Sequence, residues 1–211
     1  MGIMKMKRRS LDALKGNWGK AILLTVLISI ITVLIPTAMD MQRSGGVESW
    51  VNDEAPGSLF SFVYEIVLMP FYVGVTWFYI NLIRKEKAQI RNIFKIYQDG
   101  RLTLKLIWTY IVMIFFILLW TLLLIVPGII KSISYSQTLY VLRDHPEYSA
   151  TQAITESRRL MNGYKWKYVL FLLSFIGWFL LTAITFGLAW FFVGPYFSAA
   201  QAVFYDELKE Q

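Results

Sequence analysis

Two ionisable residues lie in apolar stretches of this sequence and are its first candidates for chemistry. Glu65 stands in the run from 59 to 83, and Lys131 stands in a shorter stretch that begins at Pro127. Charged groups in apolar surroundings pair with each other, line a polar cavity, or extend their ends to a nearby interface. Tyr135 and Gln137 add hydrogen-bonding groups close to Lys131. The sequence leaves open an ion pair between Glu65 and Lys131, a separate interfacial position for each, and a role of both in transport.

Residue types that usually perform catalysis are scarce in the chain. It has no cysteine and a single histidine, His145, which excludes disulfides, thiolate metal sites and most histidine-based acid–base centres. The common phosphate-loop, serine-hydrolase and zinc-protease motifs do not occur, and no two acidic residues stand at a plausible catalytic spacing. We therefore expect a protein that is not an enzyme and that uses no metal and no cofactor.

The apolar stretches are long enough to cross a lipid bilayer. Of the 211 residues, 56% are hydrophobic and 17% are charged, whereas a soluble domain has about 45–50% apolar and about 25% charged residues. A membrane-spanning helix needs about 20 mostly apolar residues. The pattern predicts an all-α polytopic membrane protein with six transmembrane helices arranged as three hairpins. The runs are 21–37, 59–83, 104–126, 127–142 and 168–205, the last divided in two near Phe186-Gly187.

The basic residues indicate how such a protein is oriented. Of the 21 Lys and Arg residues, 19 fall in the segments 1–20, 84–105, 143–167 and 206–211, which all lie on one side of a six-helix arrangement. Basic residues favour the cytoplasmic side of a membrane. We therefore expect a multi-pass protein of the cell (plasma) membrane with both termini in the cytoplasm. The net charge of +7 is then a feature of orientation, and nucleic acid is not an expected partner.

Each predicted hairpin is preceded by a segment with apolar residues at helical spacing, which predicts a cytoplasmic amphipathic helix at the interface. Ser149 and Gln152 form a capping box at the start of the third such segment. Gly16, Gly100 and Gly163 are expected to end the three helices. The chain is thus predicted to be a single domain, 1–211, with three pseudo-repeats at about 1–83, 84–143 and 144–211. Each return helix contains a proline and a glycine, which in transporters often mark a binding site.

Basic and aromatic residues cluster next to these segments, where a lipid headgroup layer would lie. We expect membrane lipids as partners, bound through their anionic headgroups at the inner face. A protein partner or a second copy of the chain is also compatible with the sequence. The headgroup candidates are Arg8, Arg9, Lys20, Arg158, Arg159, Lys165 and Lys167.

Several sequence motifs resemble those of a known family. The segments that carry the likeness are Leu14-x-Gly16-x-Trp18, Pro127-Gly128-Ile129-Ile130, Tyr135-Ser136, Tyr140, the block from Ala150 to Gly163, 173–178, Gly194-Pro195-Tyr196 and Phe204-Tyr205. Together they resemble the bacterial integral-membrane family catalogued as domain of unknown function nine-seven-five. A more distant likeness is to the membrane domains of glycerophosphodiester phosphodiesterases. The resemblance implies topology and location, and it assigns no catalytic residue.

These observations favour a non-enzymatic protein of the bacterial cytoplasmic membrane that binds lipid, peptide or a partner protein in envelope maintenance. The alternative is a small membrane transporter or channel with a polar site around Glu65 and Lys131.

Overall fold

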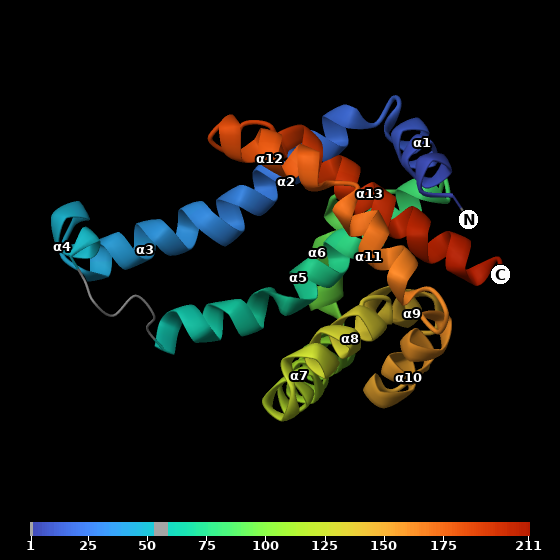
Figure 1. The fold of residues 1–211 in the computed structure, drawn as a ribbon. Helices are drawn as coiled ribbons and strands as arrows, with labels where there is room; N and C mark the ends of the chain where they lie inside the picture. Colours follow the sequence, from blue (N-terminus) through green and yellow to red (C-terminus); the bar gives the residue numbers. More distant parts are fainter. Residues whose placement is uncertain (1, 53–58) are drawn as a thin grey trace.

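The computed structural model describes residues 2–52 and 59–211, and every regular element in that part of the chain is helical (Figure 1). The first third contains α1 (Ile3–Leu14), α2 (Trp18–Ser29), the π-helical turn η1 (Ile30–Leu34), α3 (Ile35–Arg43), α4 (Val47–Val51) and α5 (Leu59–Ile83). The middle contains α6 (Arg91–Lys95), the 3₁₀ turn η2 (Ile96–Gln98), α7 (Gly100–Leu123), α8 (Ile125–Tyr135) and α9 (Thr138–Asp144). The last third contains α10 (Ala150–Leu160), α11 (Lys165–Leu173), α12 (Ile176–Ile184) and α13 (Trp190–Lys209). The predicted all-α class is confirmed.

Four helices in the described part of the chain are long and apolar enough to cross a membrane. They are Trp18–Arg43, which joins α2, η1 and α3, Ser61–Ile83 in α5, Gly100–Leu123, which is α7, and Lys165–Ile184, which joins α11 and α12. Four of the six expected spans therefore have a helical counterpart. The other two, 127–142 and the second half of 168–205, do not meet the same criteria, so six spans in three hairpins are not confirmed.

The first span contains a local widening that its sequence explains. Pro36 lies at the start of α3, and a proline inside a helix clashes with the carbonyl group four residues earlier. The turn before it, Ile30–Leu34, is π-helical, a form that adds a residue to the turn and accommodates such an irregularity. The helix thereby continues past the proline to Arg43.

The stretch from Pro127 to Leu142, expected as one membrane-spanning helix, is divided between two short helices. α8 ends at Tyr135 and α9 begins at Thr138. Ser157 of α10 fills the break: its Oγ donates to the Ser134 carbonyl over 2.8 Å and accepts from the Gln137 backbone N–H over 3.2 Å. Serine and threonine side chains compete for backbone groups and weaken a helix, and this stretch is rich in them.

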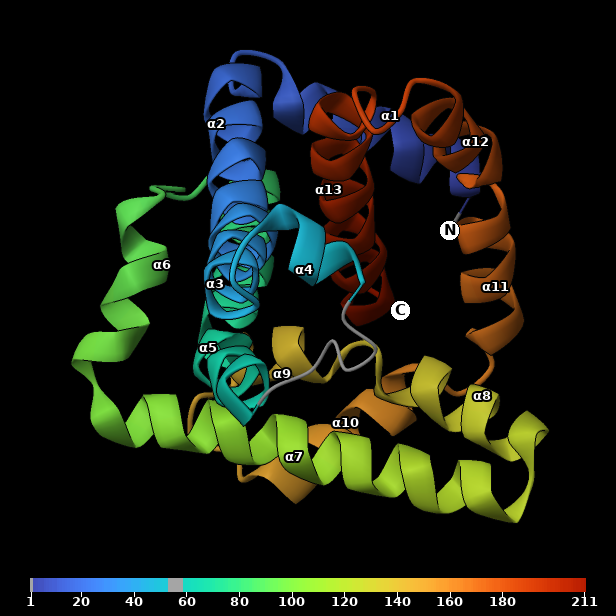
Figure 2. The same ribbon diagram turned by 90° about the vertical axis from the view of Figure 1, so that its left-hand side faces the viewer.

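The core is built around α13, which packs against α1, α2 and α5. Figure 2 shows it between α2 and the α11–α12 pair. Three small side chains, Ala199, Ala200 and Ala202, are fully buried and permit close approach of the neighbouring helices. Phe171 and Phe175 of the α11–α12 region join this core, with their ring centroids 5.4 Å apart.

The helices α7 and α8 form a tight hairpin that runs crosswise to α2, α3 and α5 (Figure 2). Gly128 makes the close approach possible, since a Cβ atom there would lie 2.9 Å from the Thr121 Cα atom of α7. Gly74 has the same role in α5, where a Cβ atom would lie 3.1 Å from the Ile93 Cα atom. The glycines of these two return segments thus serve helix packing. The candidate spans do not form one parallel bundle.

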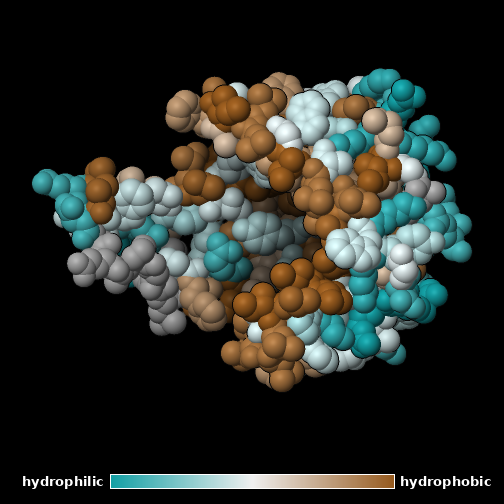
Figure 3. All heavy atoms as spheres, in the orientation of Figure 1, coloured by the Kyte–Doolittle hydropathy of each residue, from teal (hydrophilic) through white to brown (hydrophobic). Residues whose placement is uncertain are grey.

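Large apolar side chains cover much of the surface. In Figure 3, hydrophobic side chains occupy the middle of the visible face, while hydrophilic ones gather at the left-hand tip and at the right-hand side, where Figure 1 places both termini. Leu122 at the end of α7 is 88% exposed and Phe186 is 98% exposed. Such extended apolar surface is typical of a protein that contacts lipid. The fold is therefore compatible with a multi-pass membrane protein.

Several predicted local features are present. Ser149 and Gln152 form a capping box at the start of α10. Gly16 and Gly163 follow α1 and α10 with φ angles of 77° and 80°, a conformation in which glycine is favoured. The expected division near Phe186-Gly187 is a turn with φ angles of 50° and 89°.

Gly100 was expected to end a helix, and this expectation is wrong. Gly100 is the first residue of α7, and the Asp99 side chain caps that helix by accepting from the Arg101 and Leu102 backbone N–H groups. An aspartate before a helix is one of the preferred N-caps, and its effect at this position outweighs the tendency of glycine to end a helix.

Candidate functional site

Glu65 and Lys131, the two candidates in apolar stretches, face different surroundings and form no ion pair in the described part of the chain. Glu65 is exposed on α5, where it acts electrostatically on Tyr64 and Tyr72. The Lys131 ammonium group lies over the Trp120 ring of α7, 4.4 Å from its centroid. The hypothesis that they pair with each other does not hold.

Lys131 instead belongs to a basic cleft formed by α8, α10 and α11. The cleft has a volume of about 400 Å³ and is lined by Lys131, Ser134, Thr155, Arg158, Arg159, Asn162 and Lys165. It brings Lys131 together with three of the predicted headgroup residues. The cause is the position of α10, which packs against both helices of the α7–α8 hairpin and presents its arginines to α8.

Tyr135 and Gln137 lie near the break between α8 and α9, and neither lines this cleft. Both side chains are buried. The Gln137 Nε2 group donates to the Ser136 Oγ atom over 2.7 Å, while its buried Oε1 atom has no partner among the described residues. The two residues contribute to the packing of the helix break.

A second basic hollow lies between α1 and the loop from α5 to α6. Its volume is about 970 Å³, and it contains the predicted headgroup residues Arg8, Arg9 and Lys20. The complete lining is Lys5, Arg8, Arg9, Asp12, Ala13, Lys15, Asn17, Lys20, Leu82, Ile83, Lys85, Glu86, Lys87, Ala88 and Gln89. We call this hollow the α1 groove.

Positive charge dominates the α1 groove. Seven of its lining residues are basic and two are acidic. Both acids already have basic partners, since Asp12 pairs with Lys15 over 2.6 Å and Glu86 pairs with Arg143. The groove can therefore attract phosphate and other anions. Lys167, the remaining headgroup candidate, lines neither hollow and lies near the Tyr164 ring.

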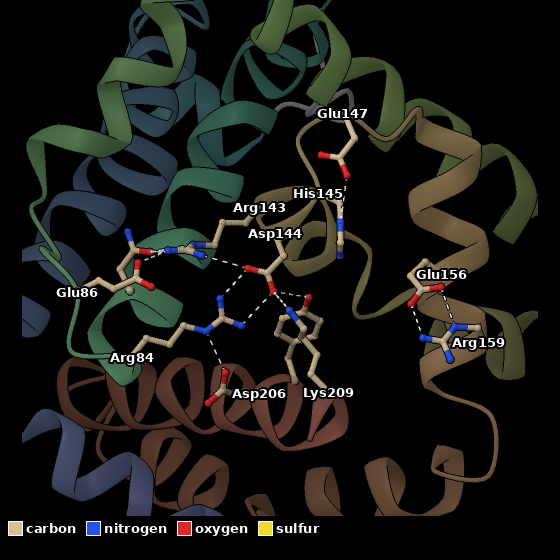
Figure 4. A network of polar contacts seen from close by, with 12 residues as sticks. Arg84, Glu86, Arg143, Asp144, His145, Glu147, Glu156, Arg159, Asp206 and Lys209 are labelled. Carbon is tan, nitrogen blue, oxygen red and sulfur yellow. Dashed lines mark hydrogen bonds and ion pairs between the residues drawn. The ribbon is translucent and has the colours of Figure 1, made fainter. Parts of the chain in front are cut away.

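A dense polar network, which the sequence analysis did not identify, joins the ends of several helices (Figure 4). Its centre is Asp144 at the end of α9, whose side chain is only 6% exposed. Arg84, just after α5, donates to both Asp144 carboxylate oxygens over 2.6 and 3.0 Å. From α13, the Tyr205 hydroxyl and the Lys209 ammonium group donate to the same carboxylate over 2.9 and 2.7 Å.

The network extends to α1 and to the loop after α5. Arg84 also donates to Asp206 of α13 over 2.9 Å, and Asp206 pairs with Arg9 of α1. Arg143 pairs with Glu86 and contacts Asp144 over 3.1 Å. Because Arg9 and Glu86 both line the α1 groove, the network forms the support of that groove.

The network stabilises the charged forms of Asp144 and Arg84. Burial raises the pKa of Asp144, but hydrogen bonds from Arg84, Lys209 and Tyr205 outweigh it and hold that pKa well below its ordinary value. The hydrogen bonds to Asp144 raise the pKa of Arg84 above its ordinary value. Asp144 is therefore ionised at neutral pH, and a fixed buried ion pair is suited to holding helices together.

A weak sequence signal for this network exists. The predicted return segments end in Ile-Arg-Lys at 83–85, Leu-Arg-Asp at 142–144 and Phe-Tyr-Asp at 204–206, so polar groups stand at the same point of each predicted pseudo-repeat. Arg84 and Tyr205 each lie about 60 residues from Asp144 in the sequence. No local pattern predicts that these residues meet.

His145 makes only local contacts: its Nδ1 atom lies 3.1 Å from Glu147, and its ring stacks on Tyr148. Within residues 2–52 and 59–211, no group of three or more His, Asp or Glu side chains is placed to hold a metal ion.

Comparison with known proteins places the chain in a family. The model of the family described as protein of unknown function (DUF975) matches residues 1–134 and 122–211. The chain belongs to this family. The resemblance noted from its motifs is thereby confirmed, whereas the distant likeness to glycerophosphodiester phosphodiesterase membrane domains is not borne out. No curated protein and no solved structure matches the chain. Membership in DUF975 assigns no activity, so function is argued from the hollows and their charges.

Proposed function

We propose that this DUF975 protein is a non-enzymatic, multi-pass protein of the bacterial cytoplasmic membrane that binds anionic lipid headgroups at its inner face. The observation that carries the proposal is the α1 groove, where five of the seven basic lining residues form no ion pair among the described residues, while Arg9 and Lys15 pair with Asp206 and Asp12. Four apolar helices of spanning length support a location in the membrane. A basic hollow beside such helices attracts anionic lipids at the cytoplasmic leaflet.

The α1 groove can surround a headgroup, because its basic residues come from three different segments of the chain. α1 supplies Arg8 and Arg9, the start of α2 supplies Lys20, and the loop after α5 supplies Lys85 and Lys87. An arginine guanidinium group can hold a phosphate through two parallel hydrogen bonds, and lysine adds point charges around it. α1 itself is held in place, because its buried residues Met6, Ser10 and Leu14 face the protein and α1 packs against α13.

The proposed orientation places the N-terminus, the α1 groove and the C-terminus at the cytoplasmic side. Figure 1 shows both termini on one side of the molecule, and Figure 3 shows that this side is hydrophilic. The sequence further predicts α8–α9 and α13 as the return segments of the second and third hairpins, which gives six crossings. In the alternative topology the α7–α8 hairpin lies along the inner surface, where Lys131 reaches the level of Arg158 and Lys165 in their shared cleft. α6 and α10, like α1, then lie close to the inner surface.

The test is selective retention of an anionic lipid. The purified protein is placed in nanodiscs of phosphatidylcholine with a small fraction of phosphatidylglycerol, re-extracted in mild detergent, and its bound lipids are measured by mass spectrometry. The double variant R8Q/K20Q is expected to retain about thirtyfold less phosphatidylglycerol, since each basic residue near an anionic surface contributes about 1 kcal/mol. The control is K95Q, which removes a charge from α6 outside the groove.

Equal enrichment of phosphatidylglycerol in the wild type and R8Q/K20Q would contradict the proposal, as would no enrichment over phosphatidylcholine in the wild type. A transporter with its polar site at Glu65 and Lys131 is the weaker alternative, because the two charges have separate neighbours. An effect of Glu65→Gln on the flux of a solute in reconstituted vesicles would favour that alternative.

A further inference from the structure

We propose that the cleft between α8, α10 and α11 is a second lipid site, which holds the phosphate group of one anionic phospholipid between Lys131, Arg158 and Lys165. The inference rests on the proposed location in the membrane, but it concerns other residues and another part of the fold. None of the residues that line this cleft lines the α1 groove. The two sites can therefore be tested separately.

The composition of the cleft selects an anion. Its lining contains four basic residues and no acid. Arg159 is already engaged, since it donates to the Glu156 carboxylate over 2.8 and 2.6 Å. The other three cations come from three different helices, α8, α10 and α11. Like charges gathered in one hollow repel each other, and a bound anion removes that cost.

Polar neutral groups complete the lining. Thr155 of α10 and Asn162, in the turn after α10, stand beside the basic residues and can donate to phosphate oxygens. The cleft volume of about 400 Å³ is sufficient for a phosphodiester and part of a headgroup, but not for a large macromolecule. The ligand chemistry is thus a phosphate group, either in a lipid or free in solution.

The position of Lys131 favours a lipid as the source of that phosphate. Its ammonium group lies over the Trp120 ring, and a cation–π contact of this kind holds the charge in place at the apolar hairpin α7–α8. Arg158 and Lys165 are near enough to act on Lys131 electrostatically. The cleft therefore joins a charge fixed on an apolar hairpin to charges at the proposed headgroup level, and it requires the α7–α8 hairpin to lie near the inner surface.

Exposed apolar side chains lie next to the basic residues along the same helices. Ile129 and Ile130 precede Lys131 on α8, and both are exposed. Trp166 follows Lys165 on α11 and is 78% exposed, and Leu170 is exposed one turn later. A free phosphate ion gains nothing from these residues, whereas the acyl chains of a phospholipid can pack along them. The site thus matches both ends of a phospholipid.

The experiment measures the protection of single lysines. Protein in phosphatidylcholine nanodiscs, with or without phosphatidylglycerol, is treated briefly with an amine-reactive reagent, and the modification of each lysine is quantified by mass spectrometry. Phosphatidylglycerol is expected to slow the modification of Lys131 and Lys165 about fivefold or more. Lys167, on the same helix but outside the cleft, is the internal control and is expected to change little. A further arm replaces the anionic lipid with millimolar inorganic phosphate.

Two variants separate this site from the α1 groove. R158Q is expected to abolish most of the protection of Lys131, and R158K to restore part of it, while R8Q leaves the protection of Lys131 unchanged. Equal modification of Lys131 with and without phosphatidylglycerol overturns the inference. Equal protection of Lys167 overturns it as well, because it indicates general surface attraction. Protection by inorganic phosphate to the same degree overturns the assignment to a lipid.

Discussion

Arg84 holds Asp144 with both ends of its guanidinium group, whose two terminal nitrogens lie 2.6 and 3.0 Å from the two carboxylate oxygens. Arg84 directly follows α5, and Asp144 is the last residue of α9. They therefore lie at the ends of the first two predicted return segments. Tyr205 and Lys209 of the third, α13, donate to the same carboxylate. One buried aspartate thus joins segments from all three predicted pseudo-repeats.

The variant D144N is expected to destabilise the protein by about 3 kcal/mol or more, because it removes the buried negative charge that Arg84 and Lys209 share and leaves Arg84 with the Asp206 carboxylate alone. The measurement is thermal unfolding in detergent, followed by circular dichroism. D12N is the matched control, since the Asp12–Lys15 pair is exposed and such pairs contribute about 1 kcal/mol or less. Similar losses in the two variants would show that Asp144 is not central to the fold.

The same pair predicts how stability depends on pH. Because hydrogen bonds hold the pKa of Asp144 below its ordinary value of 3.8, the unfolded chain binds this proton more readily than the folded one. The contribution is fully present above pH 4 and decreases as the pH falls below it. The difference in melting temperature between the wild type and D144N is therefore expected to be constant from pH 7 to 5 and to shrink toward pH 3. A difference that grows on acidification would contradict the assignment.

Local features of the fold could be predicted from the sequence because they depend on neighbouring residues. The capping box at Ser149, the left-handed glycines Gly16 and Gly163 and the turn at Phe186-Gly187 all have this origin. The prediction for Gly100 was wrong although it also depends on neighbouring residues. Glycine occurs both at the ends and at the starts of helices, and the preceding Asp99 caps the start of α7 here.

Contacts over long distances along the chain could not be predicted in this way. An ion pair between Lys131 and Glu65 was one of the arrangements that the sequence left open, because similar distances from the ends of the apolar stretches suggested similar depths. The break at Ser136-Gln137 and the packing of α10 beside α8 place it with Arg158 and Lys165 instead. The Arg84–Asp144–Asp206 network was missed since its members look like ordinary charges at helix ends. Their common position in the three predicted pseudo-repeats is a signal that could have pointed to them.

Ser157 bridges the break between α8 and α9, and its removal leaves two backbone groups without a partner. S157A is expected to cost about 1–3 kcal/mol, the penalty for unsatisfied buried polar groups, and to lower the melting temperature in detergent. The control S132A alters an exposed hydroxyl that bonds only to the Ile129 carbonyl of its own helix. Equal melting temperatures for S157A and S132A would mean that the bridge is not needed.

Gly128 permits the contact between α8 and α7, and a methyl group at this position would meet the Thr121 backbone at 2.9 Å. G128A is expected to destabilise the protein by about 1–3 kcal/mol through overpacking. Gly177 offers the comparison: it lies in α12 and has open space around its Cα atom, so G177A is expected to be neutral or slightly stabilising. Parallel unfolding curves of the two variants check the prediction, and a more stable G128A would contradict it.

The proposed six-span topology predicts which positions can be reached from outside the cell. The chain has no cysteine, so single cysteines can be introduced without a background and treated with a membrane-impermeant maleimide in intact cells. E48C in α4, L124C between α7 and α8, and L188C in the turn before α13 are expected to be labelled, because all three lie on the outer side of a six-span chain. Q98C and E210C are expected to be labelled only after the cells are opened, since both lie on the inner side.

The tips at Leu124 and Leu188 decide between four and six crossings. Both residues are largely exposed, so a failure to label them reports their side of the membrane and not their burial. If E48C is labelled in intact cells but L124C and L188C are not, α8–α9 and α13 do not return across the membrane. The crosswise α7–α8 hairpin in Figure 2 would then lie along the inner surface. Labelling of all three from outside supports three hairpins, and it requires α7 to align with α5 in the bilayer, because a spanning helix tilts by at most about 40°.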